Sequence, residues 1–164
     1  MYYNNDMISC QIPGRDTLEL SHLVCDVNGT LTHDGNLIPG VAEAFEQLKD
    51  HVNIHLVSAD TYGRLSELER ALAGSVEKFI RLKAGSEAEQ KFEYLETLQG
   101  GVAAIGQGTN DRLMIKEADL GICVMSSEGS AVETLLNADI VVPDILTALE
   151  LLLNPTRLKA TLRQ

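Results

Sequence analysis

Short apolar segments alternate with amphipathic segments along most of this 164-residue chain, and this order predicts an α/β fold. The apolar segments, such as residues 22–27 and 102–105, have the length of a buried strand, whereas the segments between them repeat apolar residues at helical spacing. The chain length suits one domain with one core. We therefore expect a single domain over residues 1–164, with a three-layer, Rossmann-like open parallel sheet and helices on both faces.

The first half of the chain is expected to open with a hairpin and then to alternate strand and helix. Residues 7–12 and 17–20 flank the turn sequence Pro-Gly-Arg-Asp, which predicts an antiparallel hairpin over residues 7–20. The apolar run 22–27 predicts the first strand of the parallel sheet. The next elements are expected as helices through residues 41–52 and 62–72 and strands at 54–59 and 76–82.

The second half repeats this alternation. A helix through residues 88–98 ends at a Gly-Gly pair, and a strand at 102–105 follows it. Asn154 and Pro155 suit the N-cap and first position of one more helical turn near the end of the chain. The elements between are expected as a helix at 110–118, strands at 120–125 and 140–142, and helices at 130–137 and 145–152.

Composition and charge narrow the classes of function. The net charge of −11 argues against a nucleic-acid or anionic-membrane surface, because phosphate contacts require clustered Lys and Arg. No apolar stretch approaches the ~20 residues that span a bilayer, and residues 1–6 lack the features of a signal peptide. Cys25 and Cys123 lie in apolar runs, which indicates buried thiols in a reduced protein. We therefore expect a cytoplasmic protein without nucleic-acid or membrane partners.

Polar residues follow three of the predicted strands. They lie in residues 26–28, 58–60 and 106–111, each directly after an apolar run. Because open parallel sheets bind ligands at the carboxyl ends of their strands, we expect these three segments to meet at one site.

These segments resemble the motifs of the haloacid-dehalogenase-like superfamily of phosphohydrolases. Residues 26–32, Asp-Val-Asn-Gly-Thr-Leu-Thr, are similar to the first motif, and their last four residues are close to those of P-type ATPases. Ser58 matches the second motif and Lys91 the third, while residues 106–111, Gly-Gln-Gly-Thr-Asn-Asp, resemble a fourth motif usually written Gly-Asp-Gly-x-Asn-Asp. The intervals between motifs leave no room for a cap domain. The chain thus resembles the small, capless, soluble P-type-ATPase-like members of that superfamily.

The resemblance implies a role for each matched residue. Asp26 would attack phosphorus and form an aspartyl phosphate, while Ser58 and Lys91 would hold and neutralise phosphoryl oxygens. The implied catalytic residues are Asp26, Asn28, Ser58 and Lys91, and the implied phosphate-binding residues are Val27, Asn28, Gly29, Ser58, Ala59 and Lys91. The implied ligands of a weakly bound Mg²⁺ are Asp26, Asn28, Gln107 and Asp111.

Two neutral amides stand where the superfamily usually carries acids. Asn28 replaces the residue that donates and accepts protons, and loss of such a group typically costs ~10²–10⁴-fold in rate. Gln107 replaces a usual Mg²⁺ ligand and brings no charge to the metal. We therefore expect slow turnover and weak metal affinity.

The leading hypothesis is a Mg²⁺-dependent phosphohydrolase that acts on a phosphorylated substrate through an aspartyl phosphate. The alternative is a catalytically silent module that binds a phosphorylated or anionic ligand. A receiver-like signalling domain fits less well, because Asp26 is the only acid in its motif. Capless relatives often use neighbouring subunits to cover the site, so a homo-oligomer is also expected.

Some residues have alternative interpretations. Lys83 competes with Lys91 for the third-motif role, and we favour Lys91 because its helix leads into the fourth motif. Residues 30–40 contain an Asp-Gly turn and are expected to form a flap, with His33 facing solvent. His51 and His55 show no metal-like spacing and are interpreted as structural.

Overall fold

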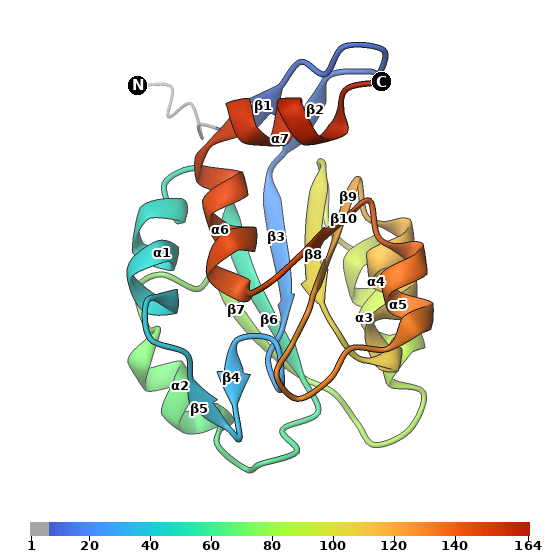
Figure 1. Cartoon of the computed structure of the whole chain (residues 1–164). Coiled ribbons are helices and arrows are strands. Elements are labelled where there is room, and N and C mark those ends of the chain that lie inside the picture. The colour runs from blue at the N-terminus through green and yellow to red at the C-terminus, as the bar shows by residue number, and fades with distance from the viewer. Residues whose placement is uncertain (1–6) are drawn as a thin grey trace.

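The computed structural model describes residues 7–164, which form a six-stranded parallel sheet between two layers of helices (Figure 1). The strands of this sheet are β3 (His22–Asp26), β6 (Asn53–Ser58), β7 (Lys78–Arg81), β8 (Val102–Gly106), β9 (Leu120–Val124) and β10 (Ile140–Val142). The helices are α1 (Val41–Leu48), α2 (Leu65–Ala71), α3 (Glu87–Glu96), α4 (Arg112–Glu117), α5 (Val132–Asn137), α6 (Ile145–Leu153) and α7 (Pro155–Leu162), with a 3₁₀ turn, η1, at Thr109–Asp111. The strand order is β10-β9-β8-β3-β6-β7. The predicted α/β fold is therefore confirmed.

The central strand β3 separates two apolar cores. Its successive side chains point to opposite faces of the sheet, as strand geometry requires. Leu23 and Cys25 pack in the larger core, to which α1, α2, α6 and α7 contribute. Val24 packs in the smaller core with side chains from α3 and α4. Figure 1 shows α1 and α6 on one side of the sheet and α3, α4 and α5 on the other.

A short antiparallel hairpin lies at each end of the parallel sheet (Figure 1). At the amino ends of the strands, β1 (Ile8–Cys10) pairs with β2 (Leu18–Leu20), and α7 packs on β1. At the carboxyl ends, β4 (Thr32–His33) pairs with β5 (Asn36–Leu37). The turn of this second hairpin uses Asp34 and Gly35 with φ of 48° and 77°, both left-handed, as a two-residue type I′ turn requires. We call this hairpin, residues 32–37, the flap.

Some predicted helix ends are wrong by several residues. The helix expected through residue 52 ends at Leu48, whose carbonyl oxygen accepts from the main-chain N–H groups of both His51 and Val52 in a tight turn. Val52 is nevertheless buried because it leads directly into β6. Tyr62 is exposed and precedes α2, since Gly63 adopts a left-handed φ of 66° before the helix begins.

The last helix begins at Pro155, as the Asn-Pro pair predicts. The side chain of Asn154, however, donates to the carbonyl oxygen of Glu150 and does not cap α7. Among residues 7–164, no helix has the length and hydrophobicity needed to cross a membrane. All three cysteines are buried and free, as predicted for Cys25 and Cys123.

Candidate functional site

Three parallel strands end side by side and bring the polar segments of the sequence together. Asp26 is the last residue of β3, Ser58 the last of β6 and Gly106 the last of β8. In the register of the sheet, Asp26 lies opposite Val57, and Cys25 lies opposite Ile105. The meeting of these segments at the carboxyl edge follows from the parallel topology.

A buried lysine joins the first and fourth segments. The Nζ atom of Lys91, on α3, lies 2.7 Å from Oδ1 of Asp26 and 2.6 Å from Oδ1 of Asp111. The side chain of Lys91 is fully buried, which is rare for lysine without partners of opposite charge. Lys83 is exposed instead. Of the two candidate lysines, the fold thus brings Lys91 to Asp26.

Asp26 and Lys91 both have shifted pKa values. Burial raises the pKa of Asp26 to about 6, and Asp111 adds to this rise, while Lys91 and Thr30 oppose it. Burial alone would lower the pKa of Lys91, but the two carboxylates together outweigh burial and hold its pKa above the usual value. Lys91 therefore stays charged at neutral pH, and one positive charge faces two carboxyl groups.

Asp111 is held entirely by protein groups. Its Oδ1 atom accepts from Lys91, and its Oδ2 atom accepts from the main-chain N–H groups of Gln107 and Gly108, at 2.8 and 2.9 Å. Gly106 permits this packing, because a Cβ atom there would lie 2.5 Å from Cγ of Asp111. A carboxylate has about four lone-pair sites, so these three contacts leave one for a metal. Asp111 holds Lys91 and the 106–108 loop in place.

The loop after β3 turns back sharply at Gly29, and we call residues 27–30 the cradle. Gly29 has a left-handed φ of 78°, a conformation that favours glycine. The Nδ2 atom of Asn28 donates to Oγ of Ser58 at 3.3 Å. Thr30 donates its hydroxyl to Oδ2 of Asp26 at 2.9 Å, a contact that the sequence did not indicate although Thr30 lies within the first motif. Val27 and Ala59 adjoin Asn28 and Ser58 in the same two loops.

Comparison of the sequence with known proteins identifies relatives of this chain. No protein-family model matches the chain. The chain is 52% identical over 91 residues to the uncharacterized protein MJ0073 of Methanocaldococcus jannaschii, covering 52% of this chain and 98% of that protein, so the two belong to one family. It is also 30% identical over 132 residues to the probable copper-transporting ATPase HMA5 of Arabidopsis thaliana, covering 75% of this chain but 12% of that protein.

Solved structures identify the fold. The cobalt-bound deoxy-D-mannose-octulosonate 8-phosphate phosphatase of Haemophilus influenzae superposes with a TM-score of 0.68 at 14% identity, covering 88% of this chain and 94% of that chain. A putative haloacid-dehalogenase superfamily hydrolase of Legionella pneumophila gives 0.61 at 16%, covering 87% of each. The chain therefore has the fold of haloacid-dehalogenase superfamily proteins. The corresponding phosphatase of Moraxella catarrhalis, solved with magnesium, phosphate and its sugar, gives 0.60 at 16%, covering 88% and 94%.

The four motifs of the haloacid-dehalogenase fold lie together here, without a cap domain in residues 7–164. The two residues that depart from those motifs are in contact. The Nε2 atom of Gln107 donates to the main-chain carbonyl oxygen of Asn28 at 3.3 Å. Rotating this amide by half a turn would place its oxygen beside the same carbonyl oxygen, and both could then serve as ligands of a cation. Adjacent Mg²⁺ ligands at ~2.1 Å lie about 3 Å apart, so the pair fits a divalent cation.

The residues that could hold a metal carry little negative charge. Among residues 7–164, no group of three or more His, Cys, Asp or Glu side chains is arranged to hold a metal. Asp26 and Asp111 are the carboxylates that would join the carbonyl oxygen of Asn28 and the amide oxygen of Gln107, and Lys91 already offsets part of their charge. Hard cations such as Mg²⁺ prefer carboxylates, so low affinity is expected.

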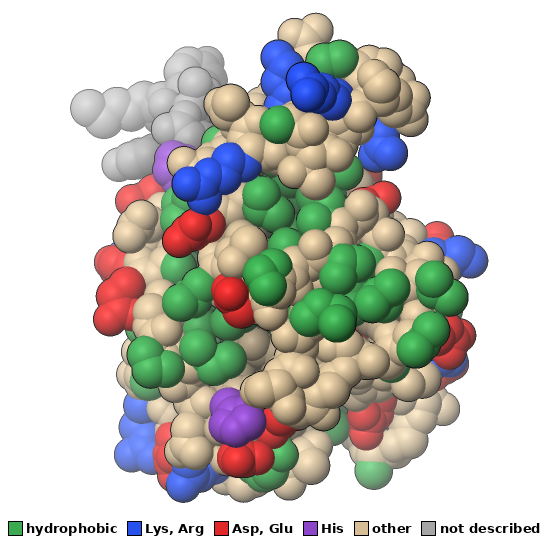
Figure 2. All heavy atoms as spheres, in the orientation of Figure 1, with side chains coloured by type: hydrophobic (Ala, Val, Ile, Leu, Met, Phe, Trp, Pro, Cys, Tyr) green, Lys and Arg blue, Asp and Glu red, His purple; other side chains and the backbone are tan. Residues whose placement is uncertain are grey.

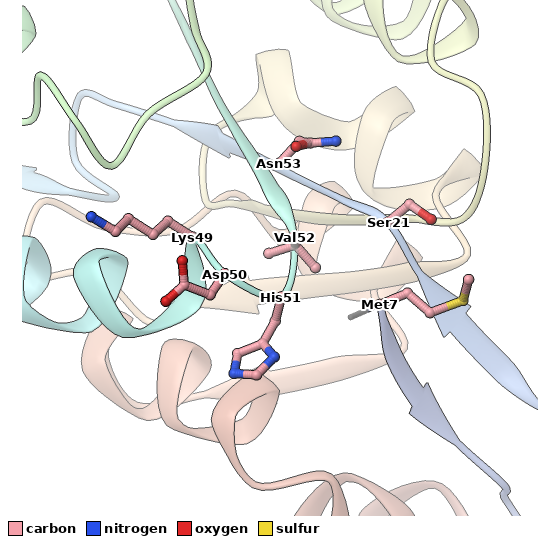
Figure 3. Close-up of a pocket in the computed structure, with 7 residues that line it drawn as sticks. All are labelled: Met7, Ser21, Lys49, Asp50, His51, Val52 and Asn53. Carbon is pink, nitrogen blue, oxygen red and sulfur yellow. The ribbon is translucent and has the colours of Figure 1, made fainter. Parts of the chain in front are cut away.

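A cavity and a pair of histidines lie towards the amino ends of the strands, opposite to the candidate site. A cavity of about 110 Å³ there is lined by Met7, Ser21, Lys49, Asp50, His51, Val52 and Asn53 (Figure 3). Nearby, His55 is buried and bonds to both His22 and Tyr94, at 3.0 and 2.9 Å. These groups lie at the amino ends of β3 and β6, away from Asp26, and the contacts of His55 support its structural interpretation.

Proposed function

We propose that this chain is a phosphohydrolase that transfers a phosphoryl group from a phosphorylated substrate to Asp26 and then to water. The observation that carries the proposal is the placement of the Asp26 carboxyl group at the end of β3, with Lys91 2.7 Å away. A carboxylate presented in this way can act as a nucleophile, and the ammonium group offsets the charge that arises when phosphate approaches it.

The reaction would proceed in two displacements. In the first, a carboxylate oxygen of Asp26 bonds to phosphorus, the ester P–O bond breaks, and the leaving oxygen takes a proton from water. In the second, water attacks phosphorus, the bond to Asp26 breaks, and inorganic phosphate leaves. The hydroxyl of Ser58 and main-chain N–H groups around Gly29 would hold the phosphoryl oxygens. Asn28 has no acidic proton to give, so proton transfer depends on solvent and turnover is slow.

A divalent cation, Mg²⁺ in our proposal, would be held by Asp26, Asp111, the carbonyl oxygen of Asn28 and the amide oxygen of Gln107. When bound, it would supply positive charge beside the phosphoryl oxygens. Two of the structural neighbours were solved with cobalt and with magnesium, which supports divalent metal use in this fold.

The alternative function is a catalytically silent module that binds a phosphorylated or anionic ligand. The contact between Gln107 and Asn28 favours it, because the amide already satisfies the carbonyl oxygen that a metal would use. Such a module would keep the cradle around Gly29 and Ser58 but would not form an aspartyl phosphate.

Hydrolysis of an aryl phosphate in the presence of Mg²⁺ separates the two functions. We expect slow hydrolysis by the wild type, none by Asp26→Asn, and a gain of ~10²-fold or more in Asn28→Asp/Gln107→Asp, which restores both acids. A wild type no faster than Asp26→Asn, together with an active restored variant, would establish the silent module. An inactive restored variant would overturn the assignment of Asp26 as nucleophile.

A further inference from the structure

Glu128 joins three loops above the candidate site. It lies between β9 and α5, and its Oε1 atom accepts from the main-chain N–H of Asp34 at 2.9 Å and from the hydroxyl of Tyr62 at 3.1 Å. Next to it, Oγ of Ser127 lies 2.8 Å from Nδ1 of His33. The flap, the loop before α2 and the loop after β9 are therefore linked to one another, and Glu128 is held in a defined position.

The second oxygen of Glu128 points at the cradle after β3. A Cβ atom on Gly29 would lie 2.7 Å from Oε2 of Glu128, and 2.1 Å from Nε2 of Gln107. The carboxylate and the amide thus lie on the side of Gly29 to which a Cβ atom would project. Because Asp34 and Tyr62 bind only Oε1, Oε2 remains directed at this space.

The charge of Glu128 is not offset by a neighbouring cation. Within the part of the chain that the structure describes, no Lys, Arg or His lies within salt-bridge distance of it. His33 pairs with Asp34, and Arg64 binds Asn36 and Glu67. Figure 2 shows acidic side chains beside a histidine at the lower end of the molecule, where the flap lies in Figure 1. The carboxylate beside Gly29 therefore keeps its negative charge without a paired cation among residues 7–164.

We propose that Glu128 determines which phosphorylated ligands the site accepts. Its carboxylate repels a ligand that carries a second anionic group next to the phosphate, and it accepts a hydrogen bond from a hydroxyl or ammonium group at that place. The preferred class is the phosphate ester of a polyol or amino alcohol, and the disfavoured class is the phosphate ester of a hydroxy acid. This inference rests on the proposed function only in requiring that phosphate binds at Asp26.

Three small esters test this selectivity: glycerol 3-phosphate, phosphoethanolamine and 3-phosphoglycerate. Their dissociation constants are measured by calorimetry on Asp26→Asn, which removes turnover, and kcat/KM is measured on the parent chain. Glu128→Gln keeps the shape of the side chain and removes its charge. Glu133→Gln is the matched control, since it removes the same charge from the adjoining helix, where the carboxylate faces Arg112 at 3.5 Å.

We expect the preference for glycerol 3-phosphate over 3-phosphoglycerate, taken as the ratio of their dissociation constants, to fall about tenfold in Glu128→Gln. This is the size of one charge–charge interaction in a solvent-exposed site. The preference should stay unchanged in Glu133→Gln. An equal fall in both variants, or no fall in Glu128→Gln, would overturn the inference. Selective binding without hydrolysis would overturn the proposed phosphohydrolase alone, whereas failure to bind any of the three esters would overturn both.

Discussion

The side-chain amide of Gln107 donates to the main-chain carbonyl oxygen of Asn28, 79 positions earlier in the chain, at 3.3 Å. These two residues are the two departures from the acidic pattern of the superfamily, and they meet at the place where a metal would bind. The amide of one satisfies the carbonyl of the other. The two departures are therefore one structural feature.

The first prediction concerns metal dependence of stability. In Gln107→Asp, a carboxylate would face the Asn28 carbonyl oxygen with no donor between them, so a cation becomes necessary. At a Mg²⁺ concentration of 100 times the dissociation constant, binding would raise the free energy of unfolding by about 2.7 kcal/mol. Thermal melts with Mg²⁺ and with EDTA measure this change. Asn28→Asp, which leaves the Gln107 amide in place, is the control, and equal Mg²⁺ responses in the two variants would contradict the prediction.

The second prediction concerns the stability cost of Asp26. Its pKa is raised to about 6 in the folded state, mainly by burial and then by Asp111, above its ordinary value of 3.8. The folded state therefore binds this proton more tightly, and stability falls as pH rises from about 4 through about 6. Asp26→Asn removes the carboxyl group that titrates, so the fall in stability caused by Asp26 disappears.

Urea unfolding at two pH values measures the effect. We expect Asp26→Asn to raise the free energy of unfolding by on the order of 1–3 kcal/mol at pH 8 and by less at pH 5. The Lys91–Asp111 pair remains in this variant. A variant that is less stable than the wild type at pH 8 would show that Asp26 stabilises the fold.

The third prediction concerns the lysine between the carboxylates. Lys91→Met leaves Asp26 and Asp111 buried without a cation, and breaking a buried pair in this way costs about 3–5 kcal/mol. Lys83→Met, at an exposed position, should change the unfolding free energy by less than ~0.5 kcal/mol. Asp26→Asn/Lys91→Met should recover part of the loss, because it removes one of the two unpaired charges. Chemical denaturation of all three variants makes the comparison, and no recovery in the double variant would argue against charge as the cause.

Much of this site was predictable because it depends on topology and on local motifs. Asp26, Ser58 and Gly106 end neighbouring parallel strands, and such ends meet whatever the details of packing. Glu128 was not predictable, because it lies in an exposed loop with no motif around it and acts only through contacts with distant loops. The contact between Gln107 and Asn28 was not predictable for the same reason, because it joins two loops that are 79 positions apart in the chain.

Helix ends were less predictable than the presence of helices. The apolar spacing that predicts α1 continues to Val52, although the helix ends at Leu48. Val52 is buried by the strand that follows it and not by the helix. Apolar periodicity shows that a side chain is buried but not which element buries it.

The fourth prediction concerns His22 and His55, which lie towards the amino ends of β3 and β6. The carbonyl oxygen of Gln99 can only accept, so Nε2 of His22 donates to it. The ring nitrogens of His55 lie 3.0 Å from Nδ1 of His22 and 2.9 Å from the hydroxyl oxygen of Tyr94. Burial, with His22 and Lys78, lowers the pKa of His55 to about 4.

Because the folded state binds this proton more weakly, the contribution of His55 to stability is present above pH 6.5 and is lost as pH falls towards about 4. Asp26 responds in the opposite direction over the same range, so thermal melts are compared in an Asp26→Asn background. His55→Gln should reduce the loss of stability on acidification between pH 6.5 and 4. An unchanged pH dependence would contradict the contribution assigned to His55.

The central claim is that Asp26 carries the phosphoryl group. Its most direct test is acid quenching during turnover of an aryl phosphate with Mg²⁺, followed by peptide mass spectrometry that locates the acyl phosphate. The result that we predict is a phosphoryl group on Asp26 in the wild type and none at any residue in Asp26→Asn. Hydrolysis without modification of Asp26, or a phosphoryl group on another residue, would contradict the mechanism.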